Sequence, residues 1–353
     1  ALLPADFVAR APLLDRKKSK PKYLQKIKTF KNSKNISNYS KIILELLSSP
    51  NIASKHWVFR QYDHEVGIRT VIKPGFDASV LRLDNGKFLS VKIDGNPKHC
   101  YLNPRDGAIG CFEEACRNVV CTGATPIGMV DHLQFGNPED PEIFWTFMES
   151  LEGLTNFAKF LKIPCVGGKV SFYNETPSGP IKPTPLIGVL GIINKTPLHP
   201  IPPKSGDYLV IVGSTKNELG GSEYFEYIDD FIGGICPTVD FKSSKSNMSI
   251  VLSLIKQDLI KSVHDCAKGG TSIAVSEMSI RTLIILEKFL KLHIEQQIKN
   301  GATVIQIFDS WAGLLEEEKL PNYIYVPTLN LVNYVKSLNI PVICFPREIK
   351  NYK

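Results

Sequence analysis

Two polar positions that follow runs of apolar residues could together bind a phosphorylated ligand. One is Asp131, after residues 127–130, and the other is the segment Gly167-Gly168-Lys169-Val170-Ser171, after residues 163–166. Paired glycines let a phosphate approach the backbone closely, because they carry no side chain. Their amides and the Ser171 hydroxyl could donate to its oxygens, while Asp131 could accept from a ribose hydroxyl or bind a metal ion. A glycine turn with a capping aspartate is the alternative interpretation.

The elements around these positions predict that they lie close together. Residues 141–161 carry an apolar stripe at helical spacing and begin with Pro141, so they predict a helix between the two runs. If the runs are parallel strands, both polar positions fall at one edge of a sheet, where α/β proteins bind ligands. The segment is not a Walker A loop, because Ile163 stands where that loop has its first glycine and Val170 follows Lys169.

The remaining elements are predicted from periodicity and turn residues. Asp84-Asn85-Gly86 predicts a tight hairpin turn, and the prolines of residues 199–207 predict a domain boundary. Strands are predicted at residues 79–83, 88–93, 184–193 and 207–213, with a strand end at 262–265, and helices at 109–121, 246–258 and 269–280, with a helical start at 41–48.

Composition excludes a disordered, collagen-like or coiled-coil chain, since hydrophobic residues make up 43% and charged residues 22%. The net charge of +7 arises in residues 16–41, which hold ten Lys or Arg residues and no acid. Such a run is usually a solvated linker. It lacks the neighbouring recognition module that nucleic-acid binding requires, so we expect no nucleic-acid partner. No window of 18 apolar residues occurs, and we expect no membrane span.

The eight cysteines form no CxxC pair and therefore no zinc-finger pattern. Cys111, Cys116 and Cys121 recur at five-residue spacing, and we interpret them as buried free thiols, which indicates a cytoplasmic location. The first residues lack a secretory signal pattern. Residue 1 is Ala rather than Met, so we expect a processed or truncated end.

Longer segments carry a resemblance to a known family. They include DGNPKHCYLNPRDGAIGCFEEACRNVVCTGATP, DHLQFGNPEDPEIFW, PCVGGKVSFYNET, PTPLIGVLGII, KNELGGSEY and SVHDCAKGGTSIAVSEM. Over about residues 1–280 the chain resembles the second half of the synthetase subunit of phosphoribosylformylglycinamidine synthase. The resemblance implies an α+β fold: an aminoimidazole-ribonucleotide-synthetase-like ATP-binding domain, whose mixed sheet pairs into a barrel, followed by a truncated α/β C-terminal domain.

The same resemblance implies a reaction and partners. The family uses ATP, magnesium and ammonia to convert the amide of formylglycinamide ribonucleotide to an amidine. The implied partners are the first half of the synthetase, a glutaminase subunit, a small accessory subunit and, through the sheet face, a second copy in a homodimer. Because the family's catalytic histidine lies in the first half, this chain alone is expected to be inactive. A non-catalytic nucleotide-binding module is the alternative.

Site residues carry over by position. The family's ATP contacts fall on Asp131 and Gly168, and its substrate contact falls on Ser171. Its magnesium-ligand Asn is here Lys169, whose ammonium repels the metal, so Lys169 either replaces the metal's charge or leaves the site inactive. Asp265 stands where the first half has a metal-binding Asp, with a helix N-cap as the alternative.

The sequence departs from the family pattern in two further places. Lys268 stands where the family usually has Glu. Residues 282–353, with GATVIQIFDSWAG, resemble instead a fragment of uroporphyrinogen decarboxylase, and imply a partial (β/α) barrel with a substrate contact at Ser310. A decarboxylase fragment is the third functional hypothesis, and the chain is expected to be a fusion, a truncated gene or a misassembly. The predicted domains are residues 1–40, 41–196, 204–280 and 282–353.

Overall fold

The structure, a computed structural model, describes residues 16–27, 38–199, 207–309, 317 and 320–346. The chain forms two compact units, Ala1–Ser276 and Glu277–Lys353. Helix α10 (Gly270–Lys299) contains residues of both units. The predicted boundary at residues 199–207 stays a prediction, because residues 200–206 lie outside the described residues.

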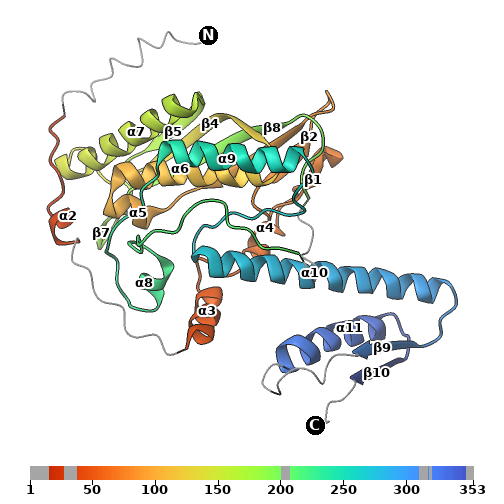
Figure 1. Cartoon of the computed structure of the whole chain (residues 1–353). Helices are drawn as coiled ribbons and strands as arrows, with labels where there is room; N and C mark the ends of the chain where they lie inside the picture. Colours follow the sequence, from red (N-terminus) through yellow and green to blue (C-terminus); the bar gives the residue numbers. More distant parts are fainter. Residues whose placement is uncertain (1–15, 28–37, 200–206, 310–316, 318–319, 347–353) are drawn as a thin grey trace. The chain divides into compact units, whose positions relative to one another are not determined.

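A six-stranded mixed sheet forms the centre of the first unit (Figure 1). Its strands, in spatial order, are β1 (Thr70–Ile72), β2 (Ser79–Arg82), β3 (Phe88–Asp94), β8 (Thr184–Ile193), β4 (Thr125–Gln134) and β5 (Cys165–Ser171). Only β4 and β5 pair in parallel, and every other neighbour is antiparallel. The expected α+β class with a mixed sheet is confirmed.

Local sequence explains the turns between these strands. The predicted hairpin joins β2 to β3, and Gly86 takes a φ of +77°, which glycine adopts without strain. A second, short hairpin of β6 (Glu175–Thr176) and β7 (Gly179–Pro180) follows β5.

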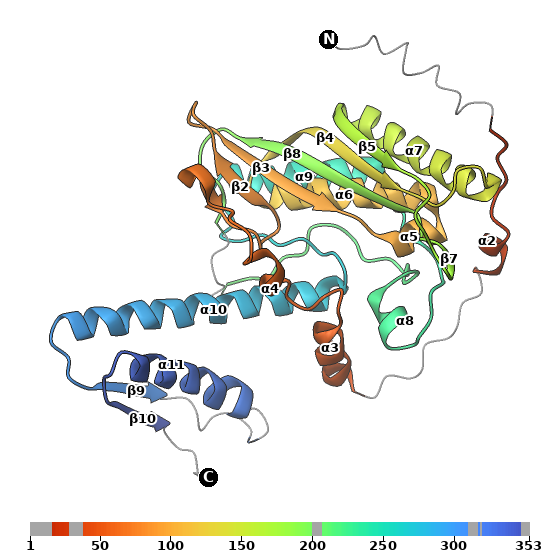
Figure 2. The same cartoon turned by 180° about the vertical axis from the view of Figure 1, so that it is seen from behind.

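Helices cover one face of the sheet. They are α6 (Pro104–Cys121) and α7 (Pro141–Leu161), with α9 (Phe241–Lys256) packed against both (Figures 1 and 2). The helix interface is aromatic: the rings of Phe112 and Phe157 meet edge to face with centroids 5.3 Å apart. The three cysteines of α6 are buried, as predicted.

Among the described residues of the first unit, no helix lies over the opposite face of the sheet (Figure 2). Side chains alternate along a strand, so Val130 and Ile93 lie on this face, on either side of Gly188. Ile93 is 63% exposed and Val166 is 62% exposed. The sheet therefore presents apolar side chains on both faces, one packed and one open.

Shorter helices and irregular segments complete the first unit. The helices are α2 (Tyr23–Lys26), α3 (Tyr39–Ser48), α4 (His56–Phe59), the 3₁₀ turn η2 (Val66–Ile68), α5 (Pro97–Leu102) and α8 (Glu223–Tyr227). The strand predicted at residues 207–213 and the strand end at 262–265 are wrong, because both segments are irregular. An apolar run becomes a strand only where another segment supplies its hydrogen bonds, and no described residue pairs with 207–213.

The second unit has a small core of its own. Parallel strands β9 (Ile305–Asp309) and β10 (Val342–Pro346) flank the π turn η5 (Pro321–Tyr325) and α11 (Val326–Ser337). Its core residues are Ile294, Ile305, Leu331 and Val335. Ser310 lies outside the described residues. Across the described part of the chain, no helix has the length and hydrophobicity to cross a membrane.

Candidate functional site

Asp131 and Gly168 lie side by side across the parallel pair β4–β5. They are direct register partners, so their predicted proximity is confirmed. Both lie inside strands rather than in the bends that the sequence predicted, because β4 continues to Gln134 and β5 to Ser171. A Cβ atom at position 168 would lie 2.5 Å from Oδ1 of Asp131, so only glycine fits beside this carboxylate in its present position.

The half-buried Asp131 carboxylate is held by β5. It accepts a hydrogen bond from the backbone N–H of Lys169, and the Cys165 thiol donates to its Oδ2 at 3.5 Å. Burial raises the pKa of Asp131, and these two hydrogen bonds oppose the rise. Because every residue of β5 before Ser171 is exposed, the carboxylate borders an open strip of backbone that a ligand can reach.

Lys169 does not fit the role of a magnesium ligand. Side chains alternate along β5, so Lys169 lies on the opposite face of the sheet from the Asp131 carboxylate, beside its register partner His132. Its side chain ends in an ammonium group, which carries positive charge and no oxygen ligand for magnesium. Within the ranges that the structure describes, no group of three His, Cys, Asp or Glu side chains is placed to hold a metal ion.

Ser171 closes the strip at the end of β5. Its hydroxyl is 3.3 Å from Oδ1 of Asn174, and the Asn174 amide donates to the Ser171 carbonyl at 2.9 Å and to the Phe135 carbonyl at 3.0 Å. Asn174 therefore fixes the Ser171 backbone against the end of β4. The order Asp131, Gly168, Ser171 runs along one pair of strands.

Asp265 lies elsewhere in the first unit, in a second polar centre. It is 7% exposed, its Oδ1 is 3.2 Å from Nε of Arg117, and its Oδ2 accepts from the Asn118 amide at 3.1 Å. The same amide donates to Oδ2 of Asp94 at 3.2 Å. The interpretation of Asp265 as a helix N-cap is wrong, because α10 begins only at Gly270.

Burial controls the acidity of this centre. It raises the pKa of Asp265 to about 6, although the Arg117 guanidinium opposes the rise. Burial and the neighbouring Glu114 raise the pKa of Asp94 to about 7. Carboxylates in such surroundings resist ionisation unless cations accompany them.

Sequence reasoning missed most of this second centre. Glu114 and Asn118 come from EEACRN, where positions i and i+4 of a helix share one face, and Asp94 comes from DGN at the end of β3. A search for polar pairs at helical spacing within the otherwise apolar α6 would have found them.

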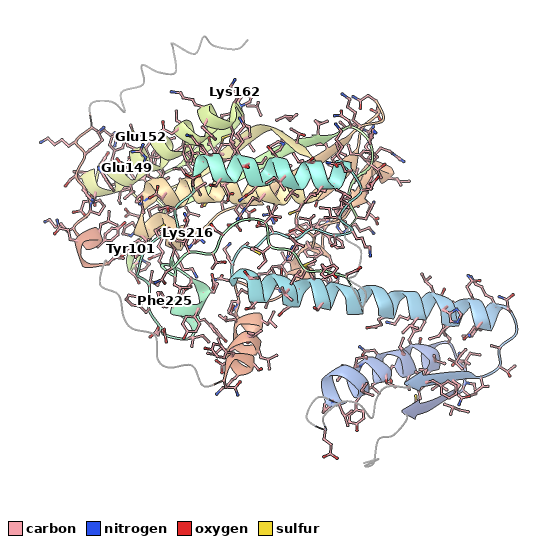
Figure 3. The ribbon with its side chains drawn as sticks, in the orientation of Figure 1. Tyr101, Glu149, Glu152, Lys162, Lys216 and Phe225 are labelled. Carbon is pink, nitrogen blue, oxygen red and sulfur yellow. The ribbon has the colours of Figure 1, made fainter. Side chains whose placement is uncertain are left out.

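A buried ion pair connects α8 to α5. Lys98 in α5 lies 2.5 Å from Glu223 and 2.6 Å from Glu226, and the Lys98 and Glu223 side chains are 8% and 3% exposed. The adjoining Phe225 (Figure 3) is 1% exposed. This contact joins residues far apart in sequence on the same side of the first unit.

Comparison with known proteins gives family-model matches in both parts of the chain. Residues 75–193 match the family model for the AIR synthase related protein, N-terminal domain, and residues 204–308 match the model for its C-terminal domain. Residues 273–351 match the model for uroporphyrinogen decarboxylase (URO-D). The last two matches overlap, so the predicted junction near residue 281 stays a prediction.

Curated relatives are longer than this chain. Phosphoribosylformylglycinamidine synthase subunit PurL of Pyrococcus abyssi is 47% identical over 234 residues, which are 66% of this chain and 33% of that protein. PurL of Methanocaldococcus jannaschii is 42% identical over 323 residues, 88% of this chain and 43% of that protein. The structure of PurLQS from Thermotoga maritima is 26% identical, with a TM-score of 0.40, over 54% of this chain and 30% of that one. The chain spans 33% to 43% of the length of these two curated relatives.

Proposed function

We propose that this chain is the second half of a phosphoribosylformylglycinamidine synthase synthetase subunit, which acts in the ATP-dependent conversion of formylglycinamide ribonucleotide to formylglycinamidine ribonucleotide. The 47% identity to PurL over 234 residues supports the assignment. The observation that carries the mechanism is the pairing of Asp131 with Gly168 across β4–β5. ATP would supply the phosphoryl group that activates the amide oxygen, so that ammonia can displace phosphate.

The residues of this chain would bind and orient the nucleotide. Gly168 carries no side chain, so the Asp131 carboxylate fills the space beside its backbone and would be the first group that an approaching ribose hydroxyl meets. The Asp131 carboxylate is placed to accept from a hydroxyl group, and Ser171 would contact the substrate at the end of β5, with its side chain on the face of Lys169. Lys169 cannot coordinate magnesium, and its side chain lies on the opposite face of the edge strand β5, so it would have to reach around that edge to supply its positive charge to a phosphate.

The chain would need partners to complete the reaction. The proposed partners are a separately encoded first half, a glutaminase subunit that supplies ammonia and a small accessory subunit. The open apolar face of the sheet supports pairing with that first half or, in its absence, with a second copy in a homodimer. All eight cysteines are free, which supports a reducing cytoplasm as the location.

Nucleotide binding by the full chain tests this function. We expect a fluorescent ATP analogue to bind the wild type with similar affinity with and without magnesium, and Gly168→Ala to weaken binding at least tenfold. Gly110→Ala is the matched control, because a Cβ at Gly110 meets no atom within 4 Å. Equal affinity of Gly168→Ala and the wild type would contradict the placement of the nucleotide, and a strict magnesium requirement would contradict the role of Lys169.

Turnover separates the ligase from a non-catalytic nucleotide-binding module. We expect the chain alone to show no ATP hydrolysis dependent on ammonia and formylglycinamide ribonucleotide, and to gain it when a first half is added. Bound nucleotide that is never turned over, even with a first half present, would favour the non-catalytic module.

A separate origin is proposed for residues 282–353, as a fragment of a uroporphyrinogen decarboxylase barrel. The parallel strands β9 and β10, joined through α11, support it, because a (β/α) barrel is built from such units. Porphyrinogen decarboxylation by the full chain tests it, and we expect none, since only about two of the eight units of such a barrel are present.

A further inference from the structure

Residues 208–212 of the first unit are both apolar and exposed. Their sequence is YLVIV, and we call them the apolar run. In chain order, the five side chains are 95%, 61%, 73%, 58% and 37% exposed. Aromatic and β-branched residues are enriched in strands, and a strand that is apolar at every position is normally covered on both faces. The apolar run therefore has the composition of a central strand, although its side chains face solvent.

The backbone of the apolar run has no partner among the described residues. Residues 208–212 make no backbone hydrogen bond there, and no described strand pairs with them. Exposed N–H and C=O groups beside apolar side chains are a template on which another chain can pair. A contiguous exposed apolar surface is also typical of protein–protein contacts. Both features indicate an interaction surface.

Contacts at both ends hold the apolar run in place. Before it, Oδ1 of Asp207 lies 2.5 Å from Nζ of Lys261. After it, Gly213 has a φ of +123°, and a Cβ atom there would lie 3.2 Å from the Asn247 side chain of α9. Because both contacts are made within the first unit, the run is presented between two anchored points.

The charges around the apolar run favour pairing with its own sequence in the antiparallel direction. No charged residue lies between Asp207 and Lys216, so two copies of the segment can meet without repulsion along the run. A parallel pair in register would place the two Asp207 carboxylates face to face. An antiparallel pair centred on Val210 places them at opposite ends, about 20 Å apart at the rise of a strand.

The side chains are complementary in the same arrangement. Around a centre at Val210, Tyr208 of one copy lies opposite Val212 of the other, and Leu209 lies opposite Ile211. Aromatic and β-branched side chains form favourable pairs when they lie opposite each other across two strands. One segment therefore provides both halves of a symmetric contact, whereas a different protein would have to supply a matching strand of its own.

We propose that the apolar run is a dimer interface, at which it pairs antiparallel with the same residues of a second copy of this chain. The two-fold axis passes through Val210, so the contact is isologous and closes at two copies. Pairing gives the backbone groups hydrogen-bond partners and covers apolar side chains. The apolar run shares no residue with the open face of the sheet, where Ile93 and Val166 are exposed, so this dimer differs from one formed through that face.

Sedimentation velocity of the full chain over a range of concentrations tests the interface. Every variant carries Ile93→Lys, which blocks association through the open sheet face. We expect Ile93→Lys alone to show a monomer–dimer equilibrium. Adding Val210→Lys places two ammonium groups opposite each other at the two-fold axis and should weaken the dimer at least tenfold. Adding Ile250→Lys instead is the matched control, because Ile250 is a 45% exposed residue of α9 outside the run, and the dimer should remain.

Cysteine cross-linking tests the register without disturbing the charge. The exposed thiols of Cys165, Cys266 and Cys344 are first replaced by serine. Residues directly opposite in an antiparallel pair have Cα atoms about 4.5–5.5 Å apart, which a disulfide can span. Val210→Cys should therefore form a covalent dimer after air oxidation. Tyr208→Cys should not, because its two copies would lie about 13 Å apart, but it should cross-link to added Val212→Cys.

Three results would overturn the proposal. The first is an Ile93→Lys chain that stays monomeric at every concentration, and the second is a dimer that Val210→Lys leaves unchanged. The third is cross-linking of Tyr208→Cys with itself as efficiently as Val210→Cys, since that result would mean a parallel or unspecific contact. Neither measurement depends on ATP or on turnover, so the outcome is independent of the proposed ligase function.

Discussion

Removing the charge of Glu223 should strongly destabilise the first unit. Glu223 and Glu226 both contact Lys98, at 2.5 Å and 2.6 Å, but their side chains are 3% and 36% exposed. Glu223→Gln would leave the buried ammonium of Lys98 with one partially solvated partner. Glu223 also accepts from the Asn51 amide at 3.0 Å, and a glutamine oxygen can retain that bond. The expected loss therefore comes from charge rather than from a missing hydrogen bond.

The magnitude follows from the burial of the pair. Breaking a buried ion pair by neutralising one member costs about 3–5 kcal/mol, because the other charge is left uncompensated. Glu226 still offsets part of that charge, so we expect Glu223→Gln to lower the free energy of unfolding by about 2–3 kcal/mol. Glu226→Gln removes the more solvated partner and should lower it by about 1 kcal/mol.

Equilibrium urea unfolding of the full chain, followed by circular dichroism, measures both variants. The double variant Lys98→Met with Glu223→Leu should recover much of the lost stability, since apolar replacement of a buried pair is often neutral. The reasoning fails if Glu223→Gln loses less than Glu226→Gln, or if the double variant is less stable than Glu223→Gln alone.

Three further predictions concern the elements around α5 and α6. Burial lowers the pKa of His99 to about 4, whereas the unfolded residue titrates near 6.5, so the folded state disfavours its protonation. The stability from this shift is complete above pH 6.5 and falls by about 3 kcal/mol as the pH drops to 4. Because the raised pKa values of Asp94 and Asp265 act in the opposite direction, the test is a comparison: in urea unfolding, the wild type should lose about 3 kcal/mol relative to His99→Gln across this range. Gly107→Ala should destabilise by about 1–3 kcal/mol, because its Cβ would lie 2.4 Å from the Cys100 backbone, whereas Gly110→Ala should be neutral or slightly stabilising in the same urea assay. Asn103→Ala should lower the melting temperature by the equivalent of about 1 kcal/mol, because it removes the cap that accepts from the first turn of α6; an unchanged melting temperature would exclude this cap as a stabilising contact.

The sequence predicted correctly those helices and turns that are determined by their own residues, such as a first-turn proline or a turn glycine. Pro141 correctly predicted the start of α7, and Asn85-Gly86 correctly predicted the β2–β3 turn. The prediction of a strand at residues 207–213 was wrong, because a strand depends on a pairing segment that its own residues do not reveal. Helix α6 begins at Pro104 rather than at residue 109, since its first turn carries polar residues that hide the apolar spacing.

The candidate site was also predicted only in part. Helical and strand spacing implied that Asp131 and Gly168 meet, and they do. Their position within the strands was missed, because a polar residue after an apolar run does not by itself end a strand. The second polar centre around Asp265 was missed almost entirely, since its members come from a strand end, a helix and a distant loop that only the folded chain brings together.

A Cβ atom at position 168 would lie 2.5 Å from Oδ1 of Asp131, so the residues that can be accommodated at these two positions depend on each other. A methyl group at 168 is tolerated only if the carboxylate at 131 has shortened or moved, so substitutions at these two sites should be epistatic. Among related chains, a residue larger than glycine at 168 should therefore accompany a smaller residue at 131.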